Sequence, residues 1–368
     1  MSTVLRLRLR DFRTYENAEM ELGPGANVIH GANGAGKTNL LEALYFGCTA
    51  RSFRTSNERE IVRFAAKTTR IEVDVQAADG EHTIAIGLTP GDRKLIQVDE
   101  ADVERIAEHP GRPLVSVFAP DRLELIKGTP ALRRAHIDAV VAGLWPSRSA
   151  TRRAYAQALA QRNALIARIR HGGSASALRA WDLELATHGI GLRNDRAKAI
   201  DLVANDYPAV AAELGLAGAS ELRYRPRTKA HTPEEFASEL SDRHQSDLER
   251  GFSQHGPHRD DLGLLRDERE LRAYGSQGEQ RLALLALLLS ERGVLASERG
   301  APPLMLLDDV MSELDAERRE RLIARLDDGG QSLITTTDLA HIPKTATKPL
   351  TVGVSGGELK TGPEALAA

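Results

Sequence analysis

The stretch Gly31-Ala32-Asn33-Gly34-Ala35-Gly36-Lys37-Thr38 decides the fold class of this chain of 368 residues. It fits the pattern G-x-x-x-x-G-K-[S/T], in which glycines let successive backbone N–H groups point at one anion. A short apolar run at 27–30 precedes it, and apolar residues at helical spacing follow over 37–48. A strand, a glycine turn and a helix N-terminus in this order predict a phosphate-binding loop. The alternative is a glycine-rich turn without a ligand, against which the flanking elements argue.

Two side chains of this loop are expected to carry chemistry. Lys37 is predicted to reach the β- and γ-phosphates of a nucleoside triphosphate, and the Thr38 hydroxyl is predicted to bind magnesium.

An apolar strand that ends in two carboxylates supplies the second half of a hydrolytic site. Residues 303–309 read Pro-Leu-Met-Leu-Leu-Asp-Asp. Asp308 is predicted to hold the magnesium ion, directly or through water, and Asp309 is the candidate base that orients the attacking water. Lys37 and Asp309 are therefore the predicted catalytic residues. The alternative is a buried strand whose acidic end only caps the next loop.

The secondary structure predicted from the sequence changes twice along the chain. Residues 1–120 read as strands with one early helix, residues 130–250 are rich in helix formers, and an α/β pattern returns after 255. This order predicts an α/β fold, a P-loop ATPase head with an inserted, mainly helical lobe. We assign the ATPase lobe to 1–125 and 296–368 and the helical lobe to 126–295. The tail after about 355 is expected to be disordered.

Composition limits the other classes of protein. The single cysteine, Cys48, excludes an internal disulfide framework and suits a reducing compartment. The longest clean apolar run, at 282–289, is far shorter than the roughly 20 residues that a membrane span requires. The net charge of −3 means that any nucleic-acid surface must be a local patch. We therefore expect a soluble, cytoplasmic protein with no membrane partner.

Residues 274–281, Tyr-Gly-Ser-Gln-Gly-Glu-Gln-Arg, precede a predicted helix and resemble the signature motif of ABC-type ATPases, Leu-Ser-Gly-Gly-Gln. Ser276 and Gly278 match that motif, whereas Gln277 and Glu279 depart from it. In that family the motif binds the γ-phosphate held by another subunit, so the resemblance implies that residues 276–279 act in trans. The alternative is an ordinary Ser276 N-cap with Glu279 completing a capping box, and this local geometry is expected in both cases.

Residues 312–315, Ser-Glu-Leu-Asp, resemble the D-loop of the same family, with Asp315 at the subunit seam. Asp315 would serve equally as the N-cap of the following helix. Where transporter-type relatives carry a switch histidine this chain has threonines, and the sequence leaves open whether Thr336 or Thr337 replaces it. That replacement, together with Asp309 where glutamate is commoner, predicts slow hydrolysis.

Further motifs spread over nearly the whole chain resemble the RecF family: Asp-Phe-Arg-Thr-Tyr at 11–15, Asn-Leu-Leu-Glu-Ala at 39–43, Arg-Ser-Phe-Arg-Thr at 51–55, Ala-Pro-Asp at 119–121, Lys-Gly at 127–128 and Gly-Pro-His-Arg-Asp-Asp at 256–261. The resemblance implies an SMC-like ATPase head that uses ATP and magnesium and forms an ATP-dependent homodimer. It also implies roles in DNA replication and repair and in the SOS response, with RecR, and through it RecO and RecA, as partners. The predicted nucleotide site comprises Gly31, Ala32, Asn33, Gly34, Ala35, Gly36, Lys37, Thr38 and Asn39.

Two clusters of arginine are candidates for DNA binding. Residues 148–198 carry ten Arg or Lys against three Asp or Glu, and a second cluster follows the phosphate loop. Arginines contact backbone phosphates without reading sequence, so duplex DNA or a single-strand/duplex junction is the expected partner. A solvated helix face is the alternative for any single arginine. The candidates are Arg51, Arg54, Arg152, Arg153, Arg162 and Arg168.

Three functions fit these motifs. The favoured one is a weak, DNA-stimulated ATPase of recombinational repair that helps to load RecA. A nucleotide-binding subunit of an ABC-type transporter is opposed by the missing switch histidine and by the basic helical insert. An ATP-switched scaffold without turnover remains open, because the presence of catalytic side chains does not prove hydrolysis.

Overall fold

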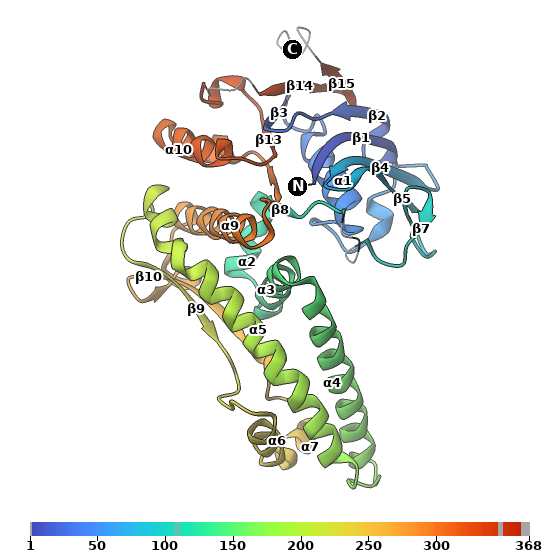
Figure 1. The fold of residues 1–368 in the computed structure, drawn as a ribbon, viewed down its shortest axis with the longest axis vertical. Coiled ribbons are helices and arrows are strands. Elements are labelled where there is room, and N and C mark those ends of the chain that lie inside the picture. The colour runs from blue at the N-terminus through green and yellow to red at the C-terminus, as the bar shows by residue number, and fades with distance from the viewer. Residues whose placement is uncertain (1, 107–108, 110, 345–348, 362–368) are drawn as a thin grey trace. The chain divides into compact units, whose positions relative to one another are not determined.

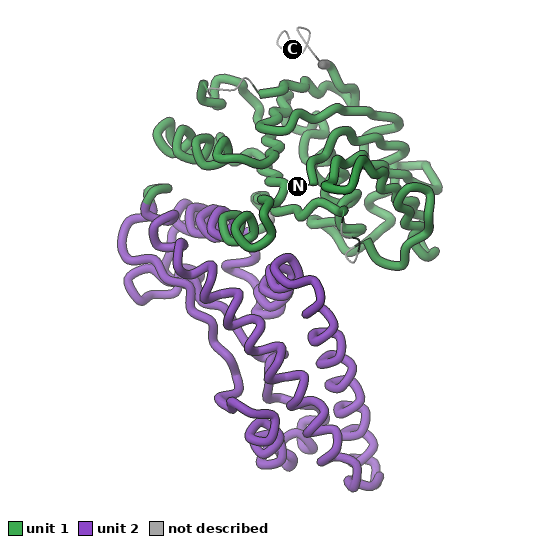
Figure 2. The backbone as a smooth tube through the Cα atoms, viewed as in Figure 1, with its two compact units in different colours: residues 1–122, 213–215, 291–368 green, residues 123–212, 216–290 purple. Residues whose placement is uncertain are grey.

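The computed structural model describes residues 2–106, 109, 111–344 and 349–361. The chain forms two compact units (Figure 1, Figure 2). Unit 1 consists of Met1–Arg122, Glu213–Gly215 and Glu291–Ala368, and unit 2 consists of Leu123–Ala212 and Leu216–Ser290. The two ends of the chain therefore build one unit, and the middle of the chain builds the other.

A mainly parallel sheet organises unit 1. Its order is β15-β14-β3-β13-β12-β8, in which β14, β3, β13, β12 and β8 are parallel and β15 is antiparallel. The central strands are nearly continuous apolar runs, as expected of parallel strands buried on both faces. Because they run the same way, the carboxyl ends of β3, β13 and β12 lie at one edge. The strands are β3 (Ala26–His30), β8 (Val115–Phe118), β12 (Leu304–Leu307), β13 (Ser332–Thr336), β14 (Leu350–Ser355) and β15 (Glu358–Thr361).

An antiparallel sheet of order β2-β1-β4-β5-β6-β7 completes unit 1. Helix α1 contacts strands of both sheets, and its residues Leu40, Leu41, Leu44 and Phe46 are buried in their shared core. The strands of this sheet are β1 (Thr3–Phe12), β2 (Tyr15–Glu21), β4 (Thr69–Ala77), β5 (Gly80–Leu88), β6 (Leu95–Val98) and β7 (Ala101–Asp102). The helices of unit 1 are α1 (Lys37–Thr49), α10 (Ala316–Asp327) and the short turns η1 (Glu58–Glu60), η6 (Val310–Glu313) and η7 (Leu339–His341).

Unit 2 is mainly helical, with a three-stranded antiparallel sheet of order β11-β10-β9. The long helices α4 and α5 run side by side (Figure 1), and α6 and α7 lie near the connection between them. Its helices are α2 (Glu124–Lys127), α3 (Pro130–Leu144), α4 (Ser149–Arg170), α5 (Leu178–Glu213), α6 (Pro233–Ser241), α7 (His244–Arg250), α8 (Leu271–Tyr274) and α9 (Gln277–Arg299), with short turns η4 (Pro146–Arg148) and η5 (Pro257–Arg259) and a connecting turn η3 (Pro120–Leu123). Its strands are β9 (Ser220–Arg225), β10 (Asp261–Arg266) and β11 (Arg269–Glu270).

The expected α/β head with a helical insertion is confirmed. Glu213, the last residue of α5, and the C-terminal part of α9, from Glu291, lie in unit 1, whereas the sequence placed residue 213 in the helical lobe. The prediction of a disordered tail is wrong for residues 358–361, because β15 pairs with β14 in register. No helix of the described residues is long and apolar enough to cross a membrane.

Candidate functional site

The predicted phosphate loop lies between the end of β3 and the first turn of α1. Gly34 (φ 79°) and Gly36 (φ 112°) adopt left-handed conformations that disfavour other residues. A Cβ at Gly36 would also stand 2.6 Å from the hydroxyl oxygen of Tyr15, which is itself buried and donates to the Gly36 carbonyl at 3.0 Å. The loop curls around the Lys37 ammonium, which donates to the Gly31 and Ala32 carbonyls at 2.7 and 3.0 Å.

Asp308, at the end of β12, meets the phosphate loop. The Thr38 hydroxyl donates to its carboxylate, with Oγ1 2.9 Å from Oδ2 and 3.0 Å from Oδ1. Thr335, at the end of β13, donates to Asp308 Oδ1 at 2.8 Å and accepts from the Asp309 N–H at 2.9 Å. Since β13 lies between β3 and β12 in the sheet, its end stands between the two predicted halves of the site.

Burial sets the charges of this centre. Burial lowers the pKa of Lys37, and the nearby Asp309 and Asp308 carboxylates oppose that effect. Burial likewise raises the pKa of Asp308, against the hydrogen bonds from Thr335 and Thr38. A hydroxyl and a carboxylate in contact are oxygen ligands of the kind that magnesium takes beside nucleotide phosphates. The residues present therefore fit the predicted ion, and its charge would offset the cost of ionising Asp308.

Asp309 differs from its neighbour. Its backbone is left-handed (φ 50°), and its Oδ1 atom is buried without a hydrogen-bond partner among the described residues. A strained backbone and an unsatisfied carboxylate oxygen are features that cluster at functional sites. The assignment of Asp309 as the base stays a prediction that these features favour.

A broad hollow of about 1090 Å³ opens beside the start of α1. Thr14 and Asn39 line it, and the Asn39 side chain donates to Thr14 Oγ1 at 3.1 Å. Most of its charged lining is cationic, and Phe64, on its rim, is 94% exposed. The lining cations are Arg13, Arg54, Arg59, Arg63 and Lys67.

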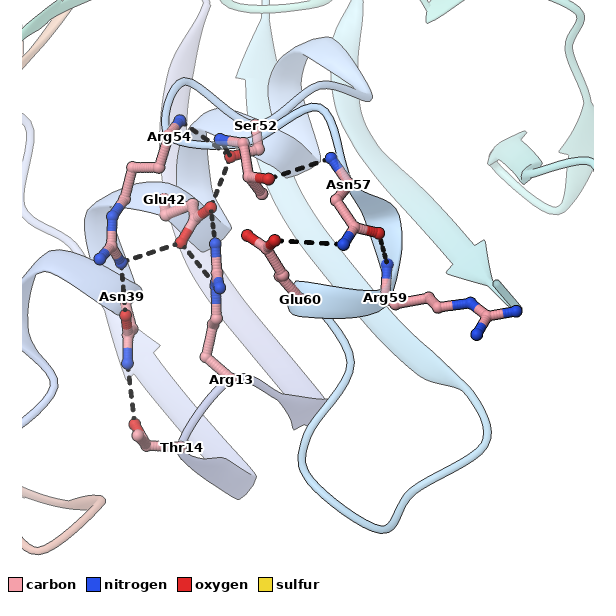
Figure 3. Close-up of polar contacts among 10 residues, drawn as sticks. Arg13, Thr14, Asn39, Glu42, Ser52, Arg54, Asn57, Arg59 and Glu60 are labelled. Atoms are coloured by element: carbon pink, nitrogen blue, oxygen red, sulfur yellow. Dashed lines mark hydrogen bonds and ion pairs between the residues drawn. The ribbon is translucent and has the colours of Figure 1, made fainter. Parts of the chain in front are cut away.

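Buried Glu42 organises the wall of this hollow (Figure 3). Arg13 binds its carboxylate through two nitrogens at 2.7 and 2.9 Å, and the Ser52 hydroxyl donates to it at 2.5 Å. Arg54 donates to the same carboxylate at 3.3 Å and to Asn39 at 2.9 Å. Arg51 and Arg54, both expected to bind DNA, are exposed, but the Arg54 guanidinium is held by Glu42 and Asn39.

The predicted signature segment belongs to unit 2. The Ser276 N–H donates to Glu279 at 2.7 Å and the Glu279 N–H donates to Ser276 Oγ at 3.3 Å, which is a capping box. The Ser276 N–H is the first cause of a lowered pKa of Glu279. Ser276, Gln277 and Gly278 are exposed, and a Cβ at Gly278 would meet no atom within 4 Å. The segment is built to present its helix N-terminus, and its action in trans stays a prediction.

Asp315 is the N-cap of α10 and accepts from the Arg318 N–H at 2.9 Å. Its carboxylate is exposed, so the capping role is observed and the D-loop role stays a prediction. The two candidates for the switch position do not contact Asp308: Thr336 Oγ1 donates to the Asp338 carbonyl, and Thr337 is exposed. Thr335 is the threonine of this segment that contacts Asp308, and which residue replaces the switch histidine stays a prediction. The sequence signal that could have predicted this contact is that Thr335 directly precedes the two candidates, at the end of a parallel strand.

The arginines predicted to bind DNA separate into two groups. Arg152, Arg153 and Arg168 are exposed on α4. The prediction is wrong for Arg162, which is 0% exposed. Its guanidinium binds Asp182 at 2.7 Å and Asp247 at 2.6 Å, so it holds helices of unit 2 together and is not accessible to a phosphate.

A phosphate loop and an acidic strand end that meet on one parallel sheet define a P-loop ATPase head of the ABC and SMC type. The family model described as the RecF/RecN/SMC N terminal domain matches residues 3–354. A solved SMC head domain from Pyrococcus furiosus superposes with a TM-score of 0.57 at 18% identity over 98% of this chain and 96% of that one, which bears on the fold alone.

Curated relatives named "DNA replication and repair protein RecF" match most of the chain. The protein from Herpetosiphon aurantiacus is 36% identical over 91% of this chain and 93% of its own length, and that from Anaeromyxobacter sp. is 36% identical over 91% and 92%. A solved structure of the recombination mediator protein RecF with ATP, described as acting in the RecFOR pathway, superposes with a TM-score of 0.87 at 29% identity, over 98% of this chain and 97% of that one. The chain belongs to the RecF family.

Proposed function

We propose that this chain is an ATP-dependent DNA-binding protein of DNA replication and recombinational repair, with slow ATP hydrolysis. The observation that carries the proposal is the contact of Thr38 with Asp308 beside the Lys37 loop, because it assembles a phosphate cradle and a magnesium site from distant segments. Thr38 and Asp308 would hold the ion, which would draw charge from the phosphates. Lys37 would bind the β- and γ-phosphates.

The nucleoside end of ATP is proposed to enter the hollow beside α1. Its lining residues Thr14 and Asn39 adjoin the Gly36 turn, and its cations suit ribose and phosphate oxygens. A polyanion of nucleotide size is attracted to such a cationic recess.

ATP is further proposed to join two copies of the chain. Lys37 and Thr38 of one copy would hold the nucleotide, and Ser276 and Gly278 of the other would cover its γ-phosphate. The exposure of Ser276, Gln277 and Gly278 at the start of α9 supports this, since the positive end of a helix dipole favours an anion. The dimer would bind duplex or gapped DNA and act with RecR, and through it RecO and RecA, in repair and the SOS response.

Hydrolysis with and without DNA tests the proposal. ATP turnover is measured on the wild type, Lys37→Met and Asp309→Asn, each with and without a gapped duplex. We expect slow turnover that DNA stimulates, loss of ATP binding in Lys37→Met, and retained ATP binding without turnover in Asp309→Asn. Turnover that ignores DNA would favour a transporter-type subunit, and a wild type without turnover would favour a scaffold.

A further inference from the structure

A small hydrophobic cluster lies beside the connection between α4 and α5. Leu165 and Ile166 of α4 pack with Leu178 of α5, and Leu248 of α7 covers them. Gly172, with φ 89°, turns the chain between the two long helices. We call residues 163–183 and 244–252 the α4–α5 tip.

Two of the three acids of this tip, Asp182 and Asp247, are buried inside it. Arg162, at the edge of the tip, binds Asp182 of α5 and Asp247 of α7, and His244 also reaches Asp182 at 2.6 Å. Both carboxylates are buried. The remaining acid of the tip, Glu249, accepts from the Gln245 side chain at 3.1 Å.

Four arginines stand exposed on the outside of the same structure: Arg168, Arg170, Arg179 and Arg250. Their guanidinium groups make no ion pair with a carboxylate of the described residues. The Arg170 guanidinium lies over Gly251, so the end of α4 and the end of α7 bring Arg170 and Arg250 together although 80 positions separate them in sequence. By contrast, exposed Arg223 and half-buried Arg225 of strand β9 bind Glu221 and Glu270.

We infer that the α4–α5 tip is a docking surface for the phosphate backbone of duplex DNA. Guanidinium groups match phosphate geometry, and the Asp182 and Asp247 carboxylates are buried against Arg162, so that Glu249 is the one exposed acid beside four exposed arginines of the tip. Trp181 is partly buried and packs against the tip core, so the proposed contact rests on the arginines, which bind phosphates without reading sequence. The inference rests on the proposed function, to which it adds the surface that DNA touches.

The test compares two fourfold variants that remove equal charge. The tip variant is Arg168→Gln, Arg170→Gln, Arg179→Gln and Arg250→Gln. The control variant is Arg223→Gln, Arg225→Gln, Arg227→Gln and Arg269→Gln, around the β9 sheet. Duplex affinity with ATP is measured by fluorescence anisotropy over a salt series, and circular dichroism and ATP affinity verify that both variants fold.

The tip variant is expected to lose at least tenfold in duplex affinity at moderate salt. The slope of log affinity against log salt is expected to shrink by about 0.9 per lost contact. ATP affinity is expected to stay at the wild-type value. A tip variant with wild-type affinity and slope overturns the inference, and points to an acidic protein as the partner of this surface. Equal losses in both variants also overturn it, since they would reflect net charge alone. A wild type that binds no duplex would refute the proposed function itself.

Discussion

The Thr38 hydroxyl lies 2.9 Å from the Asp308 carboxylate, although 270 positions separate the two residues in sequence. The contact exists because β3 and β12 are parallel strands of one sheet, so that their carboxyl ends reach the same edge. It places the first residues of α1 against the acidic strand end without any help from unit 2. The contacts of Thr38 and Thr335 with Asp308 are therefore preorganised within unit 1.

Asp308→Asn is expected to have opposite effects on the stability of the free protein and on its stabilisation by magnesium and ATP. Burial raises the pKa of Asp308, so its contribution to stability is full at low pH and is lost as the pH rises through that raised pKa. At pH 8 we expect Asp308→Asn to melt about 2 °C above the nucleotide-free wild type, and the gain to fade toward pH 4. We also expect magnesium and ATP together to stabilise the variant less. Differential scanning fluorimetry measures both effects, with exposed Asp92→Asn as the control. A variant less stable than the wild type at pH 8 would contradict this account.

Thr335 contacts the Asp308 carboxylate and the Asp309 backbone, and we predict that it positions both residues. Thr335→Val keeps the shape but removes the hydroxyl that contacts Asp308 and the Asp309 N–H. We expect turnover to fall about tenfold, equivalent to about 1.4 kcal/mol in the barrier, with ATP affinity nearly unchanged. Thr335→Ser, which restores the hydroxyl, should recover most of the rate. Steady-state hydrolysis measures the turnover, and nucleotide titration measures the ATP affinity. Full activity in the valine variant would show that the Thr335 hydroxyl has no role in hydrolysis.

Arg162 is predicted to stabilise unit 2 and not to bind DNA. Arg162→Met removes the guanidinium that the buried Asp182 and Asp247 carboxylates share, which leaves Asp182 with His244 alone and should cost about 3–5 kcal/mol of unfolding free energy. Arg168→Met, an exposed change on the same helix, should cost less than about 0.5 kcal/mol. Urea denaturation measures both. Similar small decreases in the unfolding free energy of the two variants would show that the buried ion pairs of Arg162 do not stabilise unit 2.

His258 makes unit 2 sensitive to acid. Its Nδ1 lies 2.7 Å from the Tyr155 hydroxyl and its Nε2 lies 3.0 Å from the Ser253 carbonyl, and burial lowers its pKa to about 4. A lowered histidine pKa contributes stability above the ordinary value of about 6.5, which is lost as the pH falls toward 4. The full loss is about 3 kcal/mol at 1.36 kcal/mol per pKa unit.

Denaturation at pH 7.5 and 5.0 tests this. His258→Gln cannot titrate, so its stability should depend less on pH than that of the wild type. Exposed His171→Gln serves as the matched control and should keep the wild-type dependence. Identical pH dependence in all three proteins would exclude His258 as the sensitive group.

Sequence patterns sufficed for the elements that local chemistry determines. The glycine spacing of 31–38, the apolar run that ends at Asp308 and the capping box at Ser276 each depend on neighbouring residues, and the structure contains all three. Motifs also predicted that distant Thr38 and Asp308 share one site, but pairing between distant residues that no motif marks was beyond reach. Arg162 resembles the other basic residues of α4, and only the fold places Asp182 and Asp247 around it. Thr335 was overlooked for the same reason, since its role depends on the order of parallel strands. Strand β15 was not predicted from the sequence because its partner strand, β14, was not predicted either.

The central claim, that ATP joins two copies head to tail, predicts complementation between two defective chains. Sedimentation analysis compares Lys37→Met, Ser276→Arg and their equimolar mixture, each with ATP and magnesium. Each variant alone should remain at the monomer mass of 40.0 kDa. The mixture should form a species of twice that mass with one nucleotide, because the intact phosphate loop of one chain meets the intact signature of the other. A mixture that stays monomeric while the wild type dimerises, or ATP-dependent dimers of Ser276→Arg alone, would contradict the claim.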